Sequence, residues 1–530
     1  MKNVLKQLFR GDVILWIVFL LLCVISVIEM YSSSSQLVYS AYRKAGTFYS
    51  PIVEHLRFLI IGIVLAWTCQ WIPLKIIRFG GYLLLIVSIV LLIVTLISGQ
   101  SANEASRWLT IFGYSLQPSE FAKLAVIIVV ADLISRIKEK KTDEKRIFWI
   151  MIAIVAVVCL LIFPENLSTA AMLFAVTFIM MFVGQISWKY IFLVLGIIVF
   201  LLAFLVLLIN VVPENHRPAF LKRASTWENR ILNHGSDENK YVFGDIKVTK
   251  QLFITSNTPT GQTTVEIPNN QSIEAGSLVS VHLEVAVDRE MWNIHIQDTL
   301  VAGTKYADVI AGYKHQNGTA YNESISDSAI NFVFEHIAKG IYNFEYNLQT
   351  NATVALSNKS PDIYSAYVIT DENRQSQRGK IAIAKGGLLG VGPGNSEQRN
   401  VLPGAFSDFI FAIIIEETGL ALGLFIMLLY LVLLFRAGAI ATQSRTVFLS
   451  VSCIGLALMI VVQAFVHMAV ATGLGPITGQ PLPLISRGGT SIIVTCIYFG
   501  IIFSATRSIK AEKTKEKLKS EEPVITIEEE

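Results

Sequence analysis

The chain has 530 residues, of which 53% are hydrophobic and only 16% are charged. This composition excludes an ordinary soluble enzyme, because apolar runs long enough to cross a bilayer recur along the chain. The formal net charge of +3 gives no reason to expect a nucleic-acid partner. All five cysteines fall within apolar runs, which argues against a disulfide framework or a cysteine metal cluster.

Apolar stretches predict about ten membrane spans. The first follows Lys2, Lys6 and Arg10 and has no cleavage site, so we expect a retained span rather than a signal peptide. The 136–146 loop is rich in Lys and Arg, so the positive-inside rule predicts that this loop and both chain termini are cytoplasmic. The predicted spans are 13–30, 57–73, 80–98, 118–136, 147–163, 168–185, 190–211, 406–435, 447–470 and 485–506.

Charged residues in and before the fourth span are candidates for a site. Glu120 and Lys123 stand three residues apart and therefore share one face of a helix. They form either an ion pair that neutralises both charges or part of a binding site, because ionisable residues within spans are usually functional. Arg107, beside Trp108, is either a ligand contact or an interfacial anchor. Asp132, deeper in the span, is expected to face the interior of the bundle.

Residues 242–366 differ in character from the rest of the chain. Polar and apolar residues alternate there along runs rich in β-branched and aromatic residues, as at 280–287 and 342–348. This pattern predicts half-buried antiparallel strands, here a β-sandwich of about 125 residues on the outer side. We therefore expect a first membrane part at 1–241, the inserted extracytoplasmic β-sandwich at 242–366, a second membrane part at 367–510 and a disordered cytoplasmic tail at 511–530.

Two irregular outer loops carry the strongest indications of a site. Asp408 lies where a polar segment ends and the eighth span begins, and an ionised carboxylate is costly there unless it is used or paired. Alternatively, Ser407 or Asp408 caps the following helix. The loop at 475–491 is dense in Pro and Gly, which is tolerated at membrane depth only inside protein or beside a wet cavity. Glycines between 386 and 394 either admit a ligand or simply permit turns.

Together these motifs resemble the SEDS family of bacterial cell-wall glycosyltransferases, which includes FtsW, RodA and SpoVE. The resemblance implies an all-α polytopic membrane protein of about ten spans. Four residues depart from the common family pattern, namely Asn166, Phe406, His467 and Arg487. Outside the insert the resemblance covers nearly the whole chain, through Arg107-Trp108, Gln117-Pro118-Ser119-Glu120, Lys123, Gly386 to Ser396, Leu402 to Phe411, Glu416-Glu417 and Pro476 to Ser491.

This resemblance implies polymerisation of lipid II, a lipid-linked disaccharide-pentapeptide, on the outer face of the bacterial cytoplasmic (inner) membrane. Asp408 is then the expected catalytic base for the attacking sugar hydroxyl. The family also suggests Mg²⁺ or Mn²⁺ as a cofactor, although the sequence contains no cluster with clear ligand spacing. The expected substrate-binding residues are Arg107, Glu120, Lys123, Asn395, Ser396, Ser486, Gly488 and Gly489.

The resemblance also implies partners. They are lipid II, the nascent glycan, a class B penicillin-binding protein with transpeptidase activity and other proteins of the division machinery. Asn395-Ser396 and the Pro481–Pro483 region favour a division role, as in FtsW, over the elongation role of RodA. The insert resembles a β-sandwich domain of bacterial alpha-2-macroglobulins, and it either contacts a partner or is a tolerated passenger. A lipid II flippase or a structural scaffold are the alternatives to an enzyme.

Overall fold

In the computed structural model the chain divides into two compact units. One, the membrane unit, comprises Met1–Arg230 and Arg378–Glu530, and the other, the inserted unit, comprises Ile231–Gln377. The structure describes residues 11–33, 50–98, 100–102, 105–111, 114–140, 143–197 and 374–521, together with the strands between 248 and 368.

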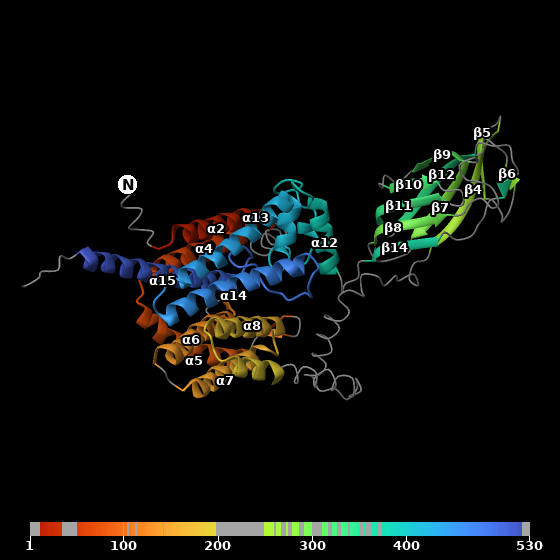
Figure 1. Cartoon of the computed structure of the whole chain (residues 1–530). Helices are drawn as coiled ribbons and strands as arrows, with labels where there is room; N and C mark the ends of the chain where they lie inside the picture. The colour runs from red at the N-terminus through yellow and green to blue at the C-terminus, as the bar shows by residue number, and fades with distance from the viewer. Residues whose placement is uncertain are drawn as a thin grey trace, which may run out of the picture. The chain divides into compact units, whose positions relative to one another are not determined.

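Long apolar helices form a bundle in the membrane unit (Figure 1). Seven of the described helices are long and apolar enough to cross a membrane. The bundle also holds α6, which is long but charged, and two shorter apolar helices. The helices are α2 (Val13–Ser33), α4 (Ser50–Cys69), α5 (Leu74–Ser98), α6 (Pro118–Lys140), α7 (Glu144–Ile162), α8 (Leu167–Val183), Trp188–Ile197, α12 (Arg374–Gly386), α13 (Ile410–Ala441), α14 (Val447–Ala471) and α15 (Gly489–Glu521).

A helix lies at each of the ten predicted spans, so the all-α polytopic class is confirmed and the chain is a multi-pass membrane protein. Several boundaries differ from the prediction, and α5 begins at Leu74 rather than at 80 while α13 ends at Ala441 rather than at 435. α4 begins at Ser50 rather than at 57, because Pro51 suits the first helical position. α15 continues to Glu521, so the segment 511–521, predicted to be disordered, is helical instead. Its Glu and Lys residues are good helix formers, and that propensity outweighs the scarcity of apolar residues.

Burial separates inner from outer helices of the bundle. In α14 and α15, 72% and 78% of the most apolar window is buried, whereas in α4 and α5 only 22% and 28% is. The outer helices expose large apolar side chains, which is the surface expected to face lipid. α6 carries charges within its span and is nevertheless almost wholly buried, because its polar side chains find partners inside the bundle.

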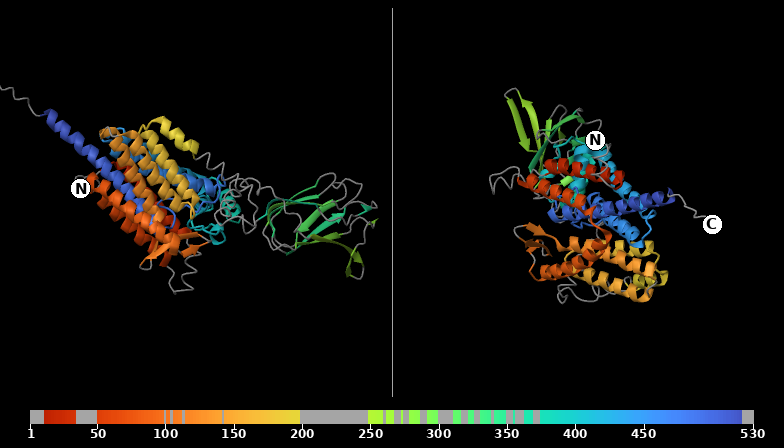
Figure 2. Two further views of the ribbon diagram at one scale, coloured as in Figure 1. Left: turned by 90° about the horizontal axis from the view of Figure 1, so that it is seen from below. Right: turned by 90° about the vertical axis from the view of Figure 1, so that its left-hand side faces the viewer.

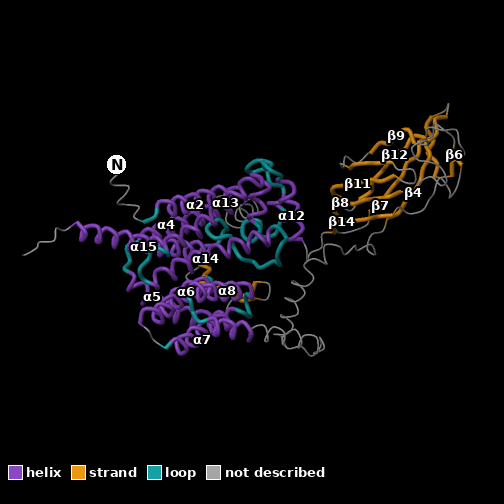
Figure 3. The backbone as a smooth tube through the Cα atoms, in the orientation of Figure 1, coloured by secondary structure: helices purple, strands orange, loops and turns teal. Residues whose placement is uncertain are grey.

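The bundle has two chemically different ends. At one, called the basic end, Arg436 donates to Asp12 Oδ2 at 2.6 Å and Arg507 donates to the Gln70 carbonyl at 3.1 Å. Burial raises the pKa of Asp12, but hydrogen bonds from Arg436 and from the Leu15 and Ile14 amides bring that pKa below its ordinary value. The opposite end, called the loop end, holds α12 and most of the irregular segments (Figure 3). Figure 2 shows α15 projecting past the other helices at the basic end.

A small antiparallel sheet stands where the sequence predicts only a loop. Its strands are β1 (Gln100–Ala102), β2 (Ala105–Ile111) and β3 (Tyr114–Leu116), in the order β1-β2-β3. Thr490 Oγ1 donates to the Ser115 carbonyl at 3.0 Å, so the sheet is tied to the start of α15. β1 and β3 have three residues each, which is too few to show alternation in the sequence.

The glycine-rich segment 386–394 packs directly on α13. Gly419 interrupts that helix with φ +79° and ψ 173°. The Val391 and Gly392 amides donate to the Glu416 and Glu417 carbonyls at 2.9 and 2.8 Å. A Cβ at Gly390 would lie 2.3 Å from the Glu417 carbonyl oxygen. The glycines are therefore explained by the close approach of two backbones. Of the two alternatives for this segment, a ligand site or turns, the structure favours turns.

Replacing Gly419 by alanine is expected to destabilise the protein strongly. A Cβ there would meet the Leu388 carbonyl oxygen at 2.2 Å, and the positive φ is unfavourable for alanine. Strain and overpacking together cost about 2–5 kcal/mol. The control is Gly438→Ala in the same helix, where an added Cβ meets nothing within 4 Å. Melting temperatures in detergent should fall only for the first variant, and equal values would refute the close-approach explanation.

The inserted unit is built from antiparallel strands. Its larger sheets have the orders β5-β4-β7-β12-β9 and β10-β11-β8-β14, and β13 pairs with β6. The predicted antiparallel pairing is present, and the sandwich packing remains a prediction. The strands are β4 (Val248–Thr258), β5 (Gly261–Glu266), β6 (Ser272–Ile273), β7 (Leu278–Val285), β8 (Met291–Asp298), β9 (Ile310–His315), β10 (Tyr321–Ile325), β11 (Ile330–Ile337), β12 (Gly340–Leu348), β13 (Val354–Ala355) and β14 (Asp362–Val368).

Candidate active site

Asp408 lies in a tight turn just before α13, at the loop end. Gly404, at φ +75°, begins the turn, and its carbonyl accepts from the Ser407 and Phe409 amides at 3.0 and 3.1 Å. The N-cap of α13 is Phe409, so neither Ser407 nor Asp408 occupies the capping position. Asp408 is half-buried, and its Oδ2 would lie 3.8 Å from a Cβ built on Gly404. The turn thus presents a partly exposed carboxylate rather than a helix cap.

The loop before α15 is bonded to this turn. Ser486 Oγ donates to the Ser407 carbonyl at 2.7 Å and accepts from the Leu482 amide at 2.7 Å. The Arg487 amide donates to the Phe406 carbonyl at 3.1 Å. The two residues before Asp408 are therefore held by the Pro/Gly-rich loop.

Buried side chains from three helices hold that loop in turn. Tyr430 of α13 donates to the Pro483 carbonyl at 2.6 Å, and Ser26 of α2 donates to the Leu484 carbonyl at 2.6 Å. Gln463 of α14 donates to the Pro481 carbonyl at 3.0 Å. Leu484 has φ +67°, an uncommon conformation for a branched residue that surrounding contacts must enforce. None of these three donors was predicted from the sequence, although polar residues inside apolar runs are a signal for such roles.

The Tyr430 hydroxyl gives a test of this arrangement. Tyr430→Phe leaves the buried Pro483 carbonyl without its donor, which costs about 1–3 kcal/mol. Tyr498→Phe is the matched control, because the buried Tyr498 hydroxyl has no hydrogen-bond partner among the described residues. We expect the melting temperature to fall for the first variant and to stay level or rise for the second. A fall of the same size in both would show that the hydrogen bond does not hold the loop.

Glu120 and Lys123 form the predicted pair inside the bundle. Lys123 Nζ donates to Glu120 Oε1 at 2.8 Å and to Gln463 Oε1 at 2.9 Å. Lys123 is fully buried and Glu120 is 3% exposed. Because Gln463 also holds the Pro481 carbonyl, a continuous polar chain runs from α6 through α14 to the loop before α15. Both charges are compensated within this chain, which favours the ion-pair reading and connects the pair to the site indirectly.

The other predicted binding residues lie in different surroundings. Gly488 and Gly489 stand at the start of α15, and a Cβ on Gly489 would meet the Phe58 ring at 2.8 Å. Ser396 is buried and donates to Glu416, while Asn395 is exposed and donates to the Val391 carbonyl at 3.2 Å. The serine hydroxyl is thus engaged in holding the 391–399 loop on α13. Arg107 belongs to β2 by its backbone, but its side chain lies outside the described part of the chain.

Glu416 and Glu417 are buried and serve the same loop. Glu416 accepts from the Glu397 and Gln398 amides, at 3.1 and 3.3 Å to its nearer oxygens, as well as from Ser396. Glu417 accepts from Ser32 of α2. Carboxylates engaged in this way are structural anchors, so the conspicuous acidic pair of the sequence supports the site without forming it.

Lys380 is a cation at the loop end that was not predicted as a site residue. It follows Gly379, where a Cβ would meet the Phe409 ring at 2.8 Å, so α12 packs closely against the residue after Asp408. The Lys380 side chain also lies against Gly473, near the end of α14. Burial lowers the pKa of its ammonium group. The signal in the sequence that could have indicated Lys380 is its position as a basic residue in the segment 367–405, before Asp408.

Two of the departures from the family pattern contact each other. The Arg487 guanidinium lies 5.9 Å from the centre of the Phe406 ring, within cation–π range, and donates to Glu54 Oε2 at 2.8 Å. The other two have structural partners, since Asn166 caps α8 by accepting from the Thr169 amide at 3.1 Å and His467 bonds the Gln480 carbonyl at 2.8 Å. All four residues thus have local partners within the described structure.

Comparison with known families decides the identity of the membrane unit. A family model described as "Cell cycle protein", covering FtsW, RodA and SpoVE, matches residues 12–236 and 341–511, most of the chain. The chain belongs to this SEDS family. Within the insert, residues 246–353 match a model of the bacterial alpha-2-macroglobulin MG10 domain, as the second resemblance predicted.

Individual relatives match this SEDS chain over shorter segments. The peptidoglycan glycosyltransferase MrdB of Escherichia coli K12 is 42% identical over 127 residues, which are 24% of this chain and 34% of that protein. The probable peptidoglycan glycosyltransferase FtsW of Dichelobacter nodosus is 42% identical over 136 residues, 25% of this chain and 34% of that protein. The matched segments thus span about a third of these relatives' length.

One solved structure shares the fold over nearly the whole chain. It is described as "Structural coordination of polymerization and crosslinking by a peptidoglycan synthase complex". It aligns with a TM-score of 0.53 and 17% identity, over 94% of this chain and 98% of its own. At 17% identity this similarity establishes a shared fold and does not by itself establish a shared activity.

Proposed function

We propose that this SEDS protein is a peptidoglycan glycosyltransferase that polymerises lipid II into glycan strands on the outer face of the cytoplasmic membrane. Family membership supports the reaction class, as do the names of the MrdB and FtsW relatives. The observation that carries the proposal is the position of Asp408, half-buried in a turn whose two preceding residues are bonded to the loop before α15. A carboxylate on a turn held in this way, at the mouth of a bundle, suits proton abstraction from a bound hydroxyl.

In the proposed reaction a sugar hydroxyl of one lipid II displaces the polyprenyl pyrophosphate of another. Asp408 takes the hydroxyl proton as the new glycosidic bond forms and the bond to pyrophosphate breaks, so one displacement inverts the anomeric centre. The departing pyrophosphate gains negative charge. The backbone amides at the start of α15, at Gly488 and Gly489, and the Lys380 ammonium are the candidates to stabilise it.

A divalent cation, Mg²⁺ or Mn²⁺, is also proposed from the family resemblance. It would share the charge of the pyrophosphate when bound. Among the described residues, however, no group of three or more His, Cys, Asp and Glu side chains is arranged to hold a metal ion. The described side chains thus do not fit a preformed site of this kind, and no step of the proposed reaction passes through a metal ion.

The cellular setting completes the proposal. Basic residues gather at one end of the bundle, which supports cytoplasmic termini and an extracytoplasmic insert in the inner membrane. A class B penicillin-binding protein is the proposed partner, since the fold matches that of a chain from a peptidoglycan synthase complex. We favour a role in division, with other division proteins, over elongation on the residues at 395–396 and 481–483.

A polymerisation assay tests the proposed activity. The full chain, purified in detergent and then placed in liposomes, is supplied with fluorescent lipid II, and products are separated by gel electrophoresis. Glycan chains of increasing length are the expected result. A flippase would instead move the lipid between leaflets and leave it monomeric, and a scaffold would do neither, so absence of polymer from folded protein in the presence of its partner would overturn the proposal.

A further inference from the structure

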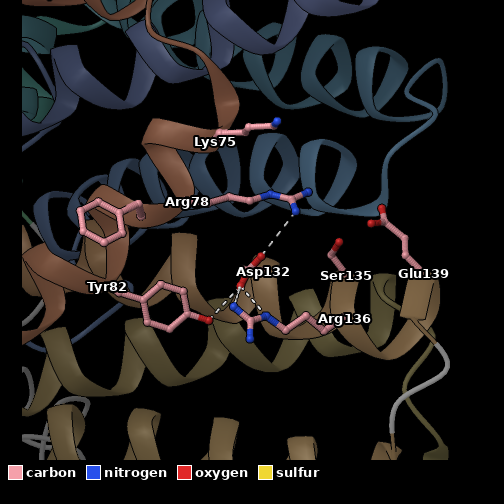
Figure 4. Close-up of a pocket in the computed structure, with 8 residues that line it drawn as sticks. Lys75, Arg78, Tyr82, Asp132, Ser135, Arg136 and Glu139 are labelled. Atoms are coloured by element: carbon pink, nitrogen blue, oxygen red, sulfur yellow. Dashed lines mark hydrogen bonds and ion pairs between the residues drawn. The ribbon is translucent and has the colours of Figure 1, made fainter.

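A second polar site lies at the basic end of the bundle, far along the helices from the Asp408 turn. A cavity of about 280 Å³ opens between α5 and α6, close to the start of α5 and the end of α6 (Figure 4). Its walls include Lys75 and Arg78 of α5, and Asp132, Ser135 and Arg136 of α6. None of these residues takes part in the proposed glycosyl transfer.

Asp132 organises the polar groups of the cavity. This carboxylate is 3% exposed, which confirms the prediction that it faces inward. Its Oδ2 accepts from the Tyr82 hydroxyl at 2.8 Å and from Arg136 Nε at 2.8 Å, while its Oδ1 lies 3.7 Å from Arg78 Nη1. The Arg78 guanidinium also lies 4.2 Å from the centre of the Phe448 ring. The two guanidinium groups are therefore held in place before any ligand arrives.

Positive charge exceeds negative charge around this cavity. Three basic side chains face two acidic ones, and Glu139 accepts from the Val447 amide at 2.9 Å, so its charge serves the N-terminus of α14. Lys75 has no ion pair with any described acidic residue. The Ser135 hydroxyl, in a residue 1% exposed, has no hydrogen bond within the described part of the chain. An ammonium, a guanidinium and a hydroxyl together are donors suited to a phosphate.

An apolar stripe on α5 leads away from the cavity. Large apolar side chains recur at spacings of three and four residues and are more than half exposed. This spacing places them on one face of the helix, as a hydrocarbon chain lying along it would require. A free phosphate would not contact this stripe, whereas a lipid would place its headgroup in the cavity and its acyl chains on the stripe. The stripe consists of Ile76, Phe79, Leu83, Ile86 and Val90.

We propose that the cavity binds the phosphate of an anionic membrane phospholipid, whose acyl chains lie along the stripe on α5. Lys75, Arg78 and Ser135 donate to the phosphate, and Asp132 keeps the guanidinium groups in position. Basic pockets between membrane helices at the cytoplasmic side suit such headgroups. The site is independent of the proposed enzymatic activity and anchors the end of the bundle opposite to Asp408.

Native mass spectrometry of the delipidated full chain in detergent tests the proposal. The probes are phosphatidylglycerol, phosphatidylcholine and inorganic phosphate. We expect Lys75→Gln/Arg78→Gln to weaken phosphatidylglycerol binding by about 10- to 30-fold. The control Lys145→Gln/Arg146→Gln removes the same charges from exposed positions in the first turn of α7 and is expected to bind as the unaltered chain does.

Three results would overturn the proposal. They are equal phosphatidylglycerol binding by both double variants, equal affinity for phosphatidylcholine, and displacement of the lipid by an equal concentration of inorganic phosphate, which would make a soluble anion the ligand. Asp132 keeps Tyr82 and Arg136 when Arg78 is replaced, so the variant is expected to fold. If the melting temperature shows that the double variant is unfolded, the single variant Lys75→Gln tests the proposal. We expect it to weaken phosphatidylglycerol binding by about three- to fivefold.

Discussion

Replacing Asp408 by asparagine is expected to reduce lipid II polymerisation by about 10²–10⁴-fold. Asparagine has nearly the same shape but cannot accept the proton of the attacking hydroxyl. The carbonyls of Gly404, Phe406 and Ser407 accept hydrogen bonds that hold the turn, and Asp408→Asn leaves these bonds in place. The loss should therefore fall on kcat, with KM for lipid II little changed.

Replacing an exposed acidic residue at the same end of the bundle is the control that separates loss of the catalytic base from a general change in charge. Glu397 lies at the same end of the bundle and has a side chain 70% exposed, which forms an ion pair with Lys385 at the surface. Glu397→Gln is expected to polymerise at the unaltered rate, since exposed ion pairs contribute little. Circular dichroism and melting temperature establish that both variants fold. A folded Asp408→Asn protein with more than half the unaltered rate would show that another group is the base.

Hydropathy was sufficient to predict the membrane architecture. A bilayer admits only helices of a certain length with internally satisfied backbones, and this rule acts on composition rather than on details of packing. Local spacing was equally sufficient for Glu120 and Lys123, because residues three apart on a helix must be neighbours. Asp132 was correctly placed inside the bundle for the same kind of reason, the cost of exposing its charge to lipid.

Contacts between distant segments could not be predicted from the sequence. Ser26 and Leu484 are 458 residues apart, and nothing local to either indicates that one holds the other. The roles of the glycines were also undecided, since a glycine that admits a ligand and one that admits another backbone have the same local sequence. Only the positive φ of Gly419 and its approach to the Leu388 carbonyl distinguish them. Ser396 was predicted to bind substrate, and nothing in the local sequence indicates its hydrogen bond to Glu416, 20 residues away.

The Lys123–Glu120 pair provides the second test, of whether Lys123 contacts substrate or positions the loop before α15. Lys123→Met leaves the buried Glu120 carboxylate uncompensated, which is expected to cost about 3–5 kcal/mol of stability and most of the activity. The double variant Glu120→Gln/Lys123→Met removes both charges and is expected to regain most of the melting temperature, because a neutral pair needs no compensation. The exposed pair gives the control, since Lys385→Met is expected to cost no more than about 1 kcal/mol.

Activity of the double variant decides between the two roles. Lys123 is fully buried and its contacts run through Gln463 to the Pro481 carbonyl, so it acts on the loop and reaches the substrate only through it. We therefore expect polymerisation to recover together with stability. A double variant that melts like the unaltered protein but stays 100-fold slower would instead require direct contact between Lys123 and the pyrophosphate, because a neutral pair restores the packing and lacks only the charge.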